Sequence, residues 1–327
     1  MKQTLNILRG RLCLLLCLGL FAACSGDDDE QTPSKKTYPL TIEVAENPLI
    51  IEGAKSVATK AAISTTSTLS EFYMSYVYAG GESSDKETAT KDKVDGKWKG
   101  GNWPGDAVEP NYEVNWYAYT SGTFYRTDDA DKKPYIDFTV EESATKQHDL
   151  LVATAADTWA HCSGILSFTF DHACSALRFY VKKATNLNDH TLSVTSIVLH
   201  NVVKQGEYYF NTQSWTPTTN STTVYTLYSG SAIPLGSATT DYVPLNGNFG
   251  SASEPYLFVI PQTLTAWTPT ETLGNTYLEL TCSIDGGSSK TAYIPFGATF
   301  VQGTQHDVKI NIGKNSLYSA SNTKIFN

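Results

Sequence analysis

Cysteine is scarce in this sequence, with six among 327 residues. Three of the six lie in the first 24 residues, which leaves Cys162, Cys174 and Cys282 for the rest of the chain. An odd number argues against a framework of disulfides. Cys162 and Cys174 also flank a run with the pattern of a strand, and an extended run of that length separates its ends by about 33 Å. A disulfide needs Cα atoms within about 7 Å, so a bridge between these two is disfavoured.

Motifs of catalysis and cofactor binding are absent. The chain has no G-x-S-x-G, no H-E-x-x-H, no phosphate-binding glycine loop and no C-x-x-C. Two pairs, His161 with Cys162 and His172 with Cys174, have side chains suited to zinc, but they lie at opposite ends of one predicted strand. They cannot converge on an ion at about 2.0–2.3 Å. We therefore predict that the protein is no enzyme and binds neither cofactor nor metal, and that these side chains are capping or core residues.

Long apolar runs are also missing, apart from one at the beginning of the chain. Basic residues precede an apolar run from Leu12 to Ala23. Twelve helical residues extend about 18 Å, well short of the ~30 Å hydrocarbon core of a bilayer. The run is therefore typical of an export signal rather than of a membrane span, and we predict a signal peptide over residues 1–23.

Cys24 follows this run directly. Ala22 and Ala23 before it look like the lipobox of a bacterial lipoprotein, with Phe21 where the pattern prefers Leu. This resemblance implies cleavage between Ala23 and Cys24 and a lipid on the Cys24 thiol. The acidic run Asp27 to Glu30 resembles the export tag that sends Bacteroidales lipoproteins to the outer face of the outer membrane. The alternative is an ordinary signal peptide followed by a solvated charge run.

The remaining chain is acidic. Loss of residues 1–23 removes three of the 24 basic residues and none of the 33 acidic ones, which shifts the formal net charge from −9 to −12. Such a chain lacks the excess of basic residues that binds nucleic acid, and it has no polybasic patch for anionic lipid.

Apolar and polar residues alternate over most of the chain after a polar tether at residues 24–37. This period of two predicts strands with one buried face, which is the pattern of antiparallel sheets packed in sandwiches. The clearest runs begin at Val114, Leu166, Leu177, Leu278 and Val308. We predict an all-β protein with an N-terminal β-sandwich domain at residues 38–163, a C-terminal β-sandwich domain at 164–313 and a tail at 314–327.

Several stretches resemble the fimbrillin family, the type V pilins and related surface lipoproteins of the Bacteroidales. Residues 148–181 are similar to the family's D-L-L-x-A strand, which matches from Asp149, and to a later strand pair that contains Phe170 and His172. YLFVIPQ at 256–262 and FVQGTQHDVKINI at 300–312 resemble two further strands of the family, the second with His in place of the usual Tyr. The order of these motifs identifies the chain as a relative of the fimbrillins.

The resemblance implies two transthyretin-like β-sandwich domains and no catalysis. It also implies export as a lipoprotein, trimming by a trypsin-like protease in an early loop, and assembly by insertion of a strand from one subunit into the next. VATKAA at 57–62 has the corresponding position, so that Lys60 and Ala61 flank the expected cut, with Lys where many relatives have Arg. The tail at 314–327 is the candidate donor strand; a frayed terminus is the alternative. Shaft and tip roles both stay open.

A second function is suggested by tryptophans in Gly-, Pro- or Thr-rich stretches. Exposed tryptophans in loops can stack on sugar rings, whereas buried ones would cover the ends of a sandwich core. The alternative to a pilus subunit is therefore a surface glycan-binding lipoprotein of a nutrient-uptake system. The tryptophans concerned are Trp98, Trp103, Trp159, Trp215 and Trp267.

Overall fold

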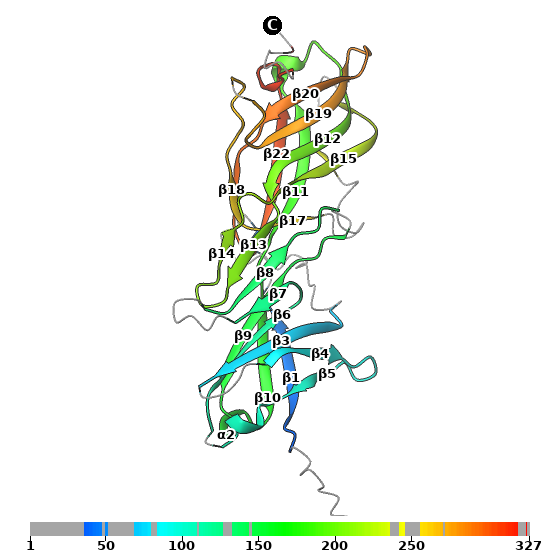
Figure 1. Ribbon diagram of the computed structural model, residues 1–327. Coiled ribbons are helices and arrows are strands. Elements are labelled where there is room, and N and C mark those ends of the chain that lie inside the picture. Colours follow the sequence, from blue (N-terminus) through cyan, green and yellow to red (C-terminus); the bar gives the residue numbers. More distant parts are fainter. Residues whose placement is uncertain are drawn as a thin grey trace, which may run out of the picture. The chain divides into compact units, whose positions relative to one another are not determined.

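The computed structural model describes residues 36–47, 50–51, 69–79, 84–109, 111–126, 133–143, 146–235, 242–245, 256–270, 272–319 and 325 (Figure 1). The chain divides into two units, residues 1–37 and 38–327, and the second holds every strand of these ranges.

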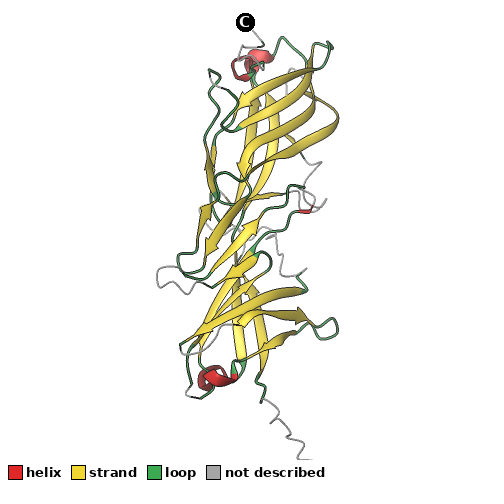
Figure 2. Ribbon diagram, in the orientation of Figure 1, coloured by secondary structure: helices red, strands yellow, loops and turns green. Residues whose placement is uncertain are grey.

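Strands dominate the described residues, and helices are confined to short turns (Figure 2). The prediction of an all-β protein is therefore confirmed. Within these residues no helix is long and apolar enough to cross a membrane. The helices are η1 (Gly105–Ala107), α2 (Trp159–Cys162), η3 (Thr185–Leu187) and η4 (Lys314–Ser316).

Seven strands form a closed sheet, in which each strand is hydrogen-bonded to a neighbour on both sides. Around the sheet the strands are β1 (Pro39–Glu46), β10 (Ile165–His172), β9 (Leu151–Asp157), β6 (Val114–Tyr119), β3 (Glu71–Tyr78), β4 (Ser84–Lys91) and β5 (Trp98–Asn102).

The inside of the closed sheet is filled by large apolar side chains. Leu166, Phe168 and Phe170 of β10 are buried, while Ser167 and Thr169 between them are exposed, as the alternation predicts. Aromatic rings pack on one another there: the rings of Phe72 and Phe170 meet edge to face with centroids 5.1 Å apart. Trp103 also lies in this core. Because such rings remove a large apolar area from water, this core is a main source of the sheet's stability.

The remaining strands form four further sheets. One contains β16 (Val243–Pro244), β11 (Ser175–Lys183), β22 (Thr304–Ile312) and β2 (Ile50–Ile51), with β17 (Leu257–Val259) also paired to β11. A second contains β15 (Thr222–Leu235), β12 (Leu192–Val203), β19 (Tyr277–Ile284) and β20 (Lys290–Pro295). A third contains β14 (Ser214–Pro217), β13 (Gln205–Tyr209), β8 (Tyr135–Thr139) and β7 (Thr123–Tyr125), and a fourth pairs β18 (Gln262–Leu264) with β21 (Ala298–Phe300).

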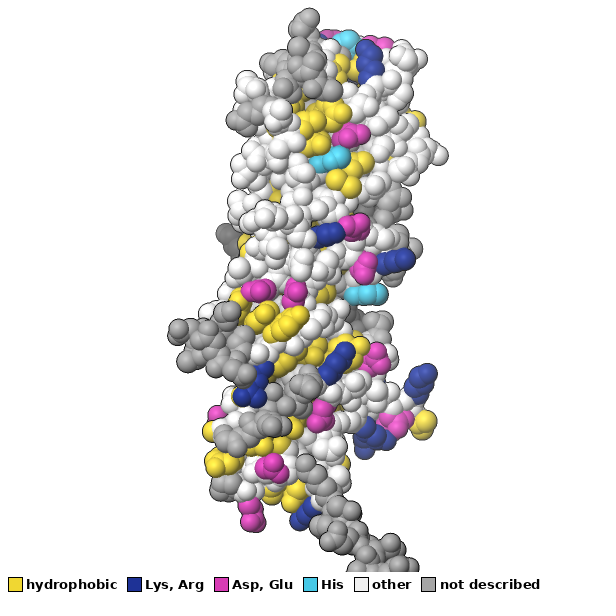
Figure 3. All heavy atoms as spheres, in the orientation of Figure 1, with side chains coloured by type: hydrophobic (Ala, Val, Ile, Leu, Met, Phe, Trp, Pro, Cys, Tyr) yellow, Lys and Arg dark blue, Asp and Glu magenta, His cyan; other side chains and the backbone are white. Residues whose placement is uncertain are grey.

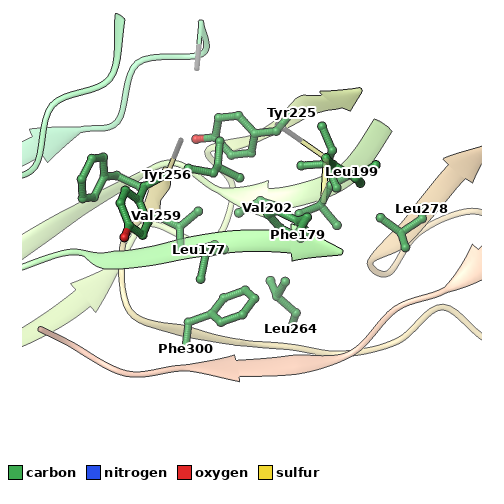
Figure 4. Packing of buried hydrophobic residues seen from close by; sticks show 14 of the residues in the cluster. Leu177, Phe179, Leu199, Val202, Tyr225, Tyr256, Val259, Leu264, Leu278 and Phe300 are labelled. Atoms are coloured by element: carbon green, nitrogen blue, oxygen red, sulfur yellow. The ribbon is translucent and has the colours of Figure 1, made fainter. Parts of the chain in front are cut away.

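A second apolar core lies among these sheets. Leu177 and Phe179 of β11 face Leu199 and Val202 of β12 and Leu278 of β19 (Figure 4). All five side chains are at most 1% exposed. The predicted inward faces of these runs are therefore confirmed.

Two long strand pairs are parallel rather than antiparallel: β1 with β10, and β11 with β22. Alternation of apolar and polar residues does not distinguish the two cases, because side chains change face at every residue in both kinds of strand. Parallel neighbours require a long connection, and the strands of each pair are more than a hundred residues apart in the chain.

Strands from either side of the predicted domain division at 163/164 share sheets. Strand β10, which follows the division, pairs with β1 and β9, which precede it. Strand β8 pairs along its length with β13 in the same way, from Thr139 opposite Gln205 to Tyr135 opposite Tyr209. Backbone hydrogen bonds therefore join the two predicted domains directly.

Candidate functional site

The predicted processing and lipidation residues, Ala23, Cys24, Lys60 and Ala61, lie outside the described residues, and these assignments stay predictions. Their neighbours along the chain are described. Strands β1 and β2 precede Lys60, and β3 follows it. A cut after Lys60 would therefore break the covalent link between β1 and the sheet that it completes. The candidate functional site is β1 together with its seat, by which we mean the neighbouring strands β10 and β5 and the apolar cluster on which β1 packs.

Strand β1 closes the seven-stranded sheet between two neighbours. It runs parallel to β10, from Thr41 opposite Ile165 to Glu46 opposite Phe170. On its other side it pairs antiparallel with β5 (Figure 1), and Ile42 lies opposite Trp98. Removal of β1 would expose two strand edges with unpaired N–H and C=O groups, and a strand of suitable pattern would satisfy both.

The side chains of β1 alternate between the core and the solvent. Leu40 and Ile42 are 6% and 4% exposed, and Val44 packs against the same apolar cluster. Thr41 and Glu43 point outward, and Glu43 accepts a hydrogen bond of 3.0 Å from the Ser167 hydroxyl. Burial of each large aliphatic side chain contributes about 1.5–3 kcal/mol, so the seat holds β1 mainly by its apolar face.

The inward row of β1 ends in a charged residue rather than an apolar one. Glu46 Oε1 lies 3.0 Å from Nε2 of His172, at the end of β10. The two side chains form a buried ion pair. The other ring nitrogen, Nδ1, is hydrogen-bonded to Oδ2 of Asp149, which precedes β9. The side chains of all three residues are buried, at 7%, 1% and 0% exposure.

Two carboxylates around one imidazole favour its charged form. Burial by itself lowers the pKa of His172, but the hydrogen bonds and charges of Asp149 and Glu46 outweigh it and raise the pKa to about 9. His172 is therefore an imidazolium at neutral pH. Asp149 Oδ1 also accepts the backbone N–H of Cys174 at 3.3 Å. Burial and the Asp149 charge raise the pKa of the Cys174 thiol well above its usual range, so this thiol stays neutral.

The pairing between β1 and β10 continues beyond this ion pair. The backbone N–H of Asn47 donates to the Phe170 carbonyl at 2.8 Å, and its side-chain amide donates to Asp171 at 2.7 Å. Further along, Ile50 and Ile51 form β2, which runs parallel to β22 opposite Thr304 and Gln305. The segment before Lys60 thus completes two different sheets.

The candidate donor at the C-terminus packs on its own chain in the part that the structure describes. Leu317 is fully buried in the second apolar core. Tyr318 and Tyr293 exchange two backbone hydrogen bonds, of 2.8 and 3.0 Å, so the tail extends the edge of β20. Ile325 donates its N–H to the Leu317 carbonyl at 3.0 Å. Donation of the tail to another subunit would require these contacts to break.

The six tryptophans all lie within the described residues, and none is exposed. Trp103 and Trp267 are nearly fully buried, and the indole N–H of half-buried Trp215 donates to the Ala173 carbonyl at 2.7 Å. These rings cover the cores and offer no stacking platform. The observation that motivates the glycan-binding alternative is therefore not found in the structure.

The remaining candidates for chemistry are separate from one another. His161 is exposed and pairs with Asp157 at 2.7 Å, whereas His172 is in the core. In the described ranges no three His, Cys, Asp or Glu side chains are grouped to hold a metal ion. The three cysteines in these ranges are free and buried. Sequence reasoning found His172 and Asp149 as motif residues but missed their partner Glu46, whose signal is an acidic residue at an inward position of an alternating run.

A family model described as fimbrillin-like matches residues 59–325. A fimbrial protein from Bacteroides vulgatus is similar in structure, with 20% sequence identity and a TM-score of 0.51 over 83% of this chain and 95% of that one. A fimbrial assembly protein from Parabacteroides distasonis is 9% identical, with a TM-score of 0.44 over 86% of this chain and 94% of that one. A candidate cell adhesion protein from Bacteroides uniformis is 14% identical, with a TM-score of 0.45 over 87% and 96%. No curated protein matches the sequence.

Proposed function

Because the chain belongs to the fimbrillin-like family, we propose that it is a surface pilus subunit or a pilus-associated adhesin that assembles by strand exchange. Cleavage after Lys60 would release β1 from its covalent connection to the rest of the sheet. A strand of a neighbouring subunit would then take its place. The function is structural, and the chain's role is to bind other subunits.

The observation that carries this proposal is the position of β1. It is hydrogen-bonded on both sides, it buries an apolar row, and it is joined to β3 only through the segment that contains Lys60. Loss of such a strand costs both backbone hydrogen bonds and apolar burial. A vacant seat would therefore bind an incoming strand strongly, which is the driving force that a non-covalent fibre needs.

Delivery to the surface rests on the first residues of the chain. The signal peptide over residues 1–23 and a lipid on Cys24 would anchor the precursor in the outer membrane, with its folded part outside. The scattered charges of the folded part fit this assignment, since acidic and basic side chains are dispersed over the face shown in Figure 3 rather than gathered by sign. Cleavage at Lys60 would detach the subunit from this anchor when it enters the fibre.

The division into two transthyretin-like domains is part of the same proposal. A division after His172, a few residues beyond the one at 163/164 that the sequence favours, would keep β10 with its neighbours β1 and β9. The pairs of β8 with β13 and of β2 with β22 would still join the two domains. The first domain is then the one that loses and regains a strand. The tail at 314–327 is the candidate donor for a shaft role; a subunit at the tip would need only the seat.

Limited digestion of the purified precursor with a trypsin-like protease tests the proposal. Mass spectrometry should find a new N-terminus at Ala61, and incubation should then give SDS-resistant ladders on gels. A Lys55→Gln variant should assemble like the unaltered protein, whereas a variant with both Lys55→Gln and Lys60→Gln, which has no lysine or arginine left between β2 and β3, should stay monomeric. Persistent monomer after verified cleavage at Lys60 would contradict assembly by strand exchange.

A further inference from the structure

The seat of β1 contains one feature that apolar packing does not explain, the His172 imidazolium at its end. We propose that this residue selects the incoming strand: the strand that replaces β1 must carry a carboxylate at the position of Glu46. This inference rests on the proposed strand exchange and specifies the partner's chemistry. The required strand has apolar residues at three alternate positions, those of Leu40, Ile42 and Val44, followed by Glu or Asp at the next inward position.

The geometry makes this position demanding. Each ring nitrogen of His172 has its own carboxylate: Asp149 at Nδ1 and Glu46 at Nε2, 3.0 Å away. Asp149 belongs to the body of the closed sheet and would remain when β1 leaves. Glu46 would leave with β1, and Nε2 would then face the vacant seat without its partner. A buried charged donor that loses its acceptor is costly, so an incoming strand with no carboxylate there is penalised.

A neutral acceptor would be a poor substitute. It carries no negative charge to attract the imidazolium, and that attraction is much stronger in a poorly solvated space than in water, so the buried positive charge would be only partly compensated. A strand without the carboxylate would therefore bind the seat less tightly than a strand with it. A difference in affinity between two strands of this kind is what makes an interface specific. The outward position of Glu43 imposes no such demand, since that side chain is exposed and touches the surface hydroxyl of Ser167.

The charge requirement also bears on which subunit supplies the strand. The tail at 314–327, KNSLYSASNTKIFN, contains no Asp or Glu. It therefore has no side-chain carboxylate to offer to His172 of another copy. The tail of another copy would therefore fill the seat without this ion pair, and we expect a subunit whose donor strand carries a carboxylate to bind the seat more tightly than a second copy does.

Competition between peptides for the seat tests the inference. The chain from Ser25 onward would receive a recognition sequence for a site-specific protease after Lys60, and a dye at its amino terminus, so that cutting yields a labelled fragment that holds β1. Unlabelled peptides would then displace this fragment, with release followed by fluorescence polarisation. The peptides are residues 36–51 unchanged, the same with Glu46→Gln, the same with Glu43→Gln, and residues 314–327.

The unchanged peptide and the Glu43→Gln peptide should compete within about twofold of each other. The Glu46→Gln peptide and the tail peptide should need about tenfold higher concentrations or more. In a His172→Gln chain, shown to be folded by circular dichroism, the Glu46→Gln peptide should regain parity with the unchanged one. If that variant does not fold, the comparison of peptides on the unaltered chain decides alone.

Two outcomes would overturn the inference in different ways. Equal competition by the unchanged and Glu46→Gln peptides on the unaltered chain would show that His172 does not select the strand, while strand exchange itself stands. Failure of every peptide to displace the fragment would show that the seat does not exchange its strand, and both proposals would then be wrong.

Discussion

Glu46 and His172 are 126 residues apart in the sequence and meet at the ends of two parallel strands, with Oε1 and Nε2 3.0 Å apart. Each occupies the inward position that follows an apolar row, Leu40 to Val44 in β1 and Leu166 to Phe170 in β10. The ion pair therefore lies where the apolar interface between the two strands ends. It links the segment before Lys60 to the part of the chain that would remain after a cut.

Glu46→Gln should destabilise the uncut protein by about 2 kcal/mol. The substitution keeps the size of the side chain but removes the charge that faces the buried imidazolium. Urea unfolding followed by tryptophan fluorescence measures the loss. Glu43→Gln is the matched control, because Glu43 lies three residues earlier on the exposed face of β1, and it should change the free energy of unfolding by no more than about 0.5 kcal/mol. Equal effects of the two substitutions would contradict the role of Glu46.

The stability of the protein should fall as the pH rises from 6.5 to 9. The pKa of His172 is about 9 in the folded state against an ordinary value of 6.5, because Asp149 and Glu46 outweigh the effect of burial. A raised pKa stabilises the fold fully below pH 6.5, and this contribution is lost as pH approaches 9. The side chain is 1% exposed, so solvent screening is small, and the loss should amount to about 3 kcal/mol.

Urea unfolding at a series of pH values measures this dependence. A His172→Gln variant should be less stable at pH 6.5 and should show a flatter profile up to pH 9. Burial also raises the pKa of Cys282, to about 11, and that of Cys174 well above its ordinary value of 9, so these thiols lower the stability at pH values above about 9. Their contribution is the same in both proteins, so the difference between the two profiles reports on His172. A profile that keeps its slope in the variant would assign the pH dependence to other groups.

The sequence predicted the strands and their buried faces well, because alternation records burial directly. Leu177, Phe179 and Val181 are all buried as their spacing requires. Alternation says nothing about which strands are neighbours or about their direction, so the parallel pairing of β1 with β10 could not be predicted from it. The pairing of β8 with β13 across the predicted domain division could not be predicted either, because hydrogen bonds between backbones depend little on the types of side chain.

Only part of the candidate site could be predicted from the sequence, for the same reason. Asp149 and His172 stand in motifs, but their contact with Glu46 depends on the register between two strands far apart in the chain. The useful signal was a charged residue at an inward position. Such a residue is expensive to bury alone, so its presence predicts a buried partner without identifying it.

Ile42→Ala should destabilise the protein by about 3 kcal/mol. Ile42 is 4% exposed, and its loss removes apolar contacts and leaves a cavity inside the closed sheet. Thr41→Ala is the matched control, because Thr41 is exposed on the other face of β1, and its effect should be within about 0.5 kcal/mol. Urea unfolding compares the two variants. If both lose the same stability, the apolar row of β1 is not what holds the strand in its seat.

Gly100→Ala should disrupt the other edge of the seat. Gly100 lies in β5, which pairs with β1, and has a φ of +131° that side chains rarely adopt. A Cβ there would lie 2.3 Å from the Thr88 carbonyl oxygen of β4, so the backbones of β4 and β5 would have to separate. We expect a loss of at least 2–3 kcal/mol, from strain and from weakened pairing with β1.

Gly96 provides the comparison for Gly100, because it also has a positive φ, +70°, but a Cβ there would meet no atom within 4 Å. Gly96→Ala should therefore cost only the conformational strain of about 1 kcal/mol. Hydrogen exchange should locate the difference: Gly100→Ala should speed exchange of the amides of β1 that pair with β5, and Gly96→Ala should leave them protected. Equal exchange of β1 in the two variants would show that β5 does not hold this edge of β1.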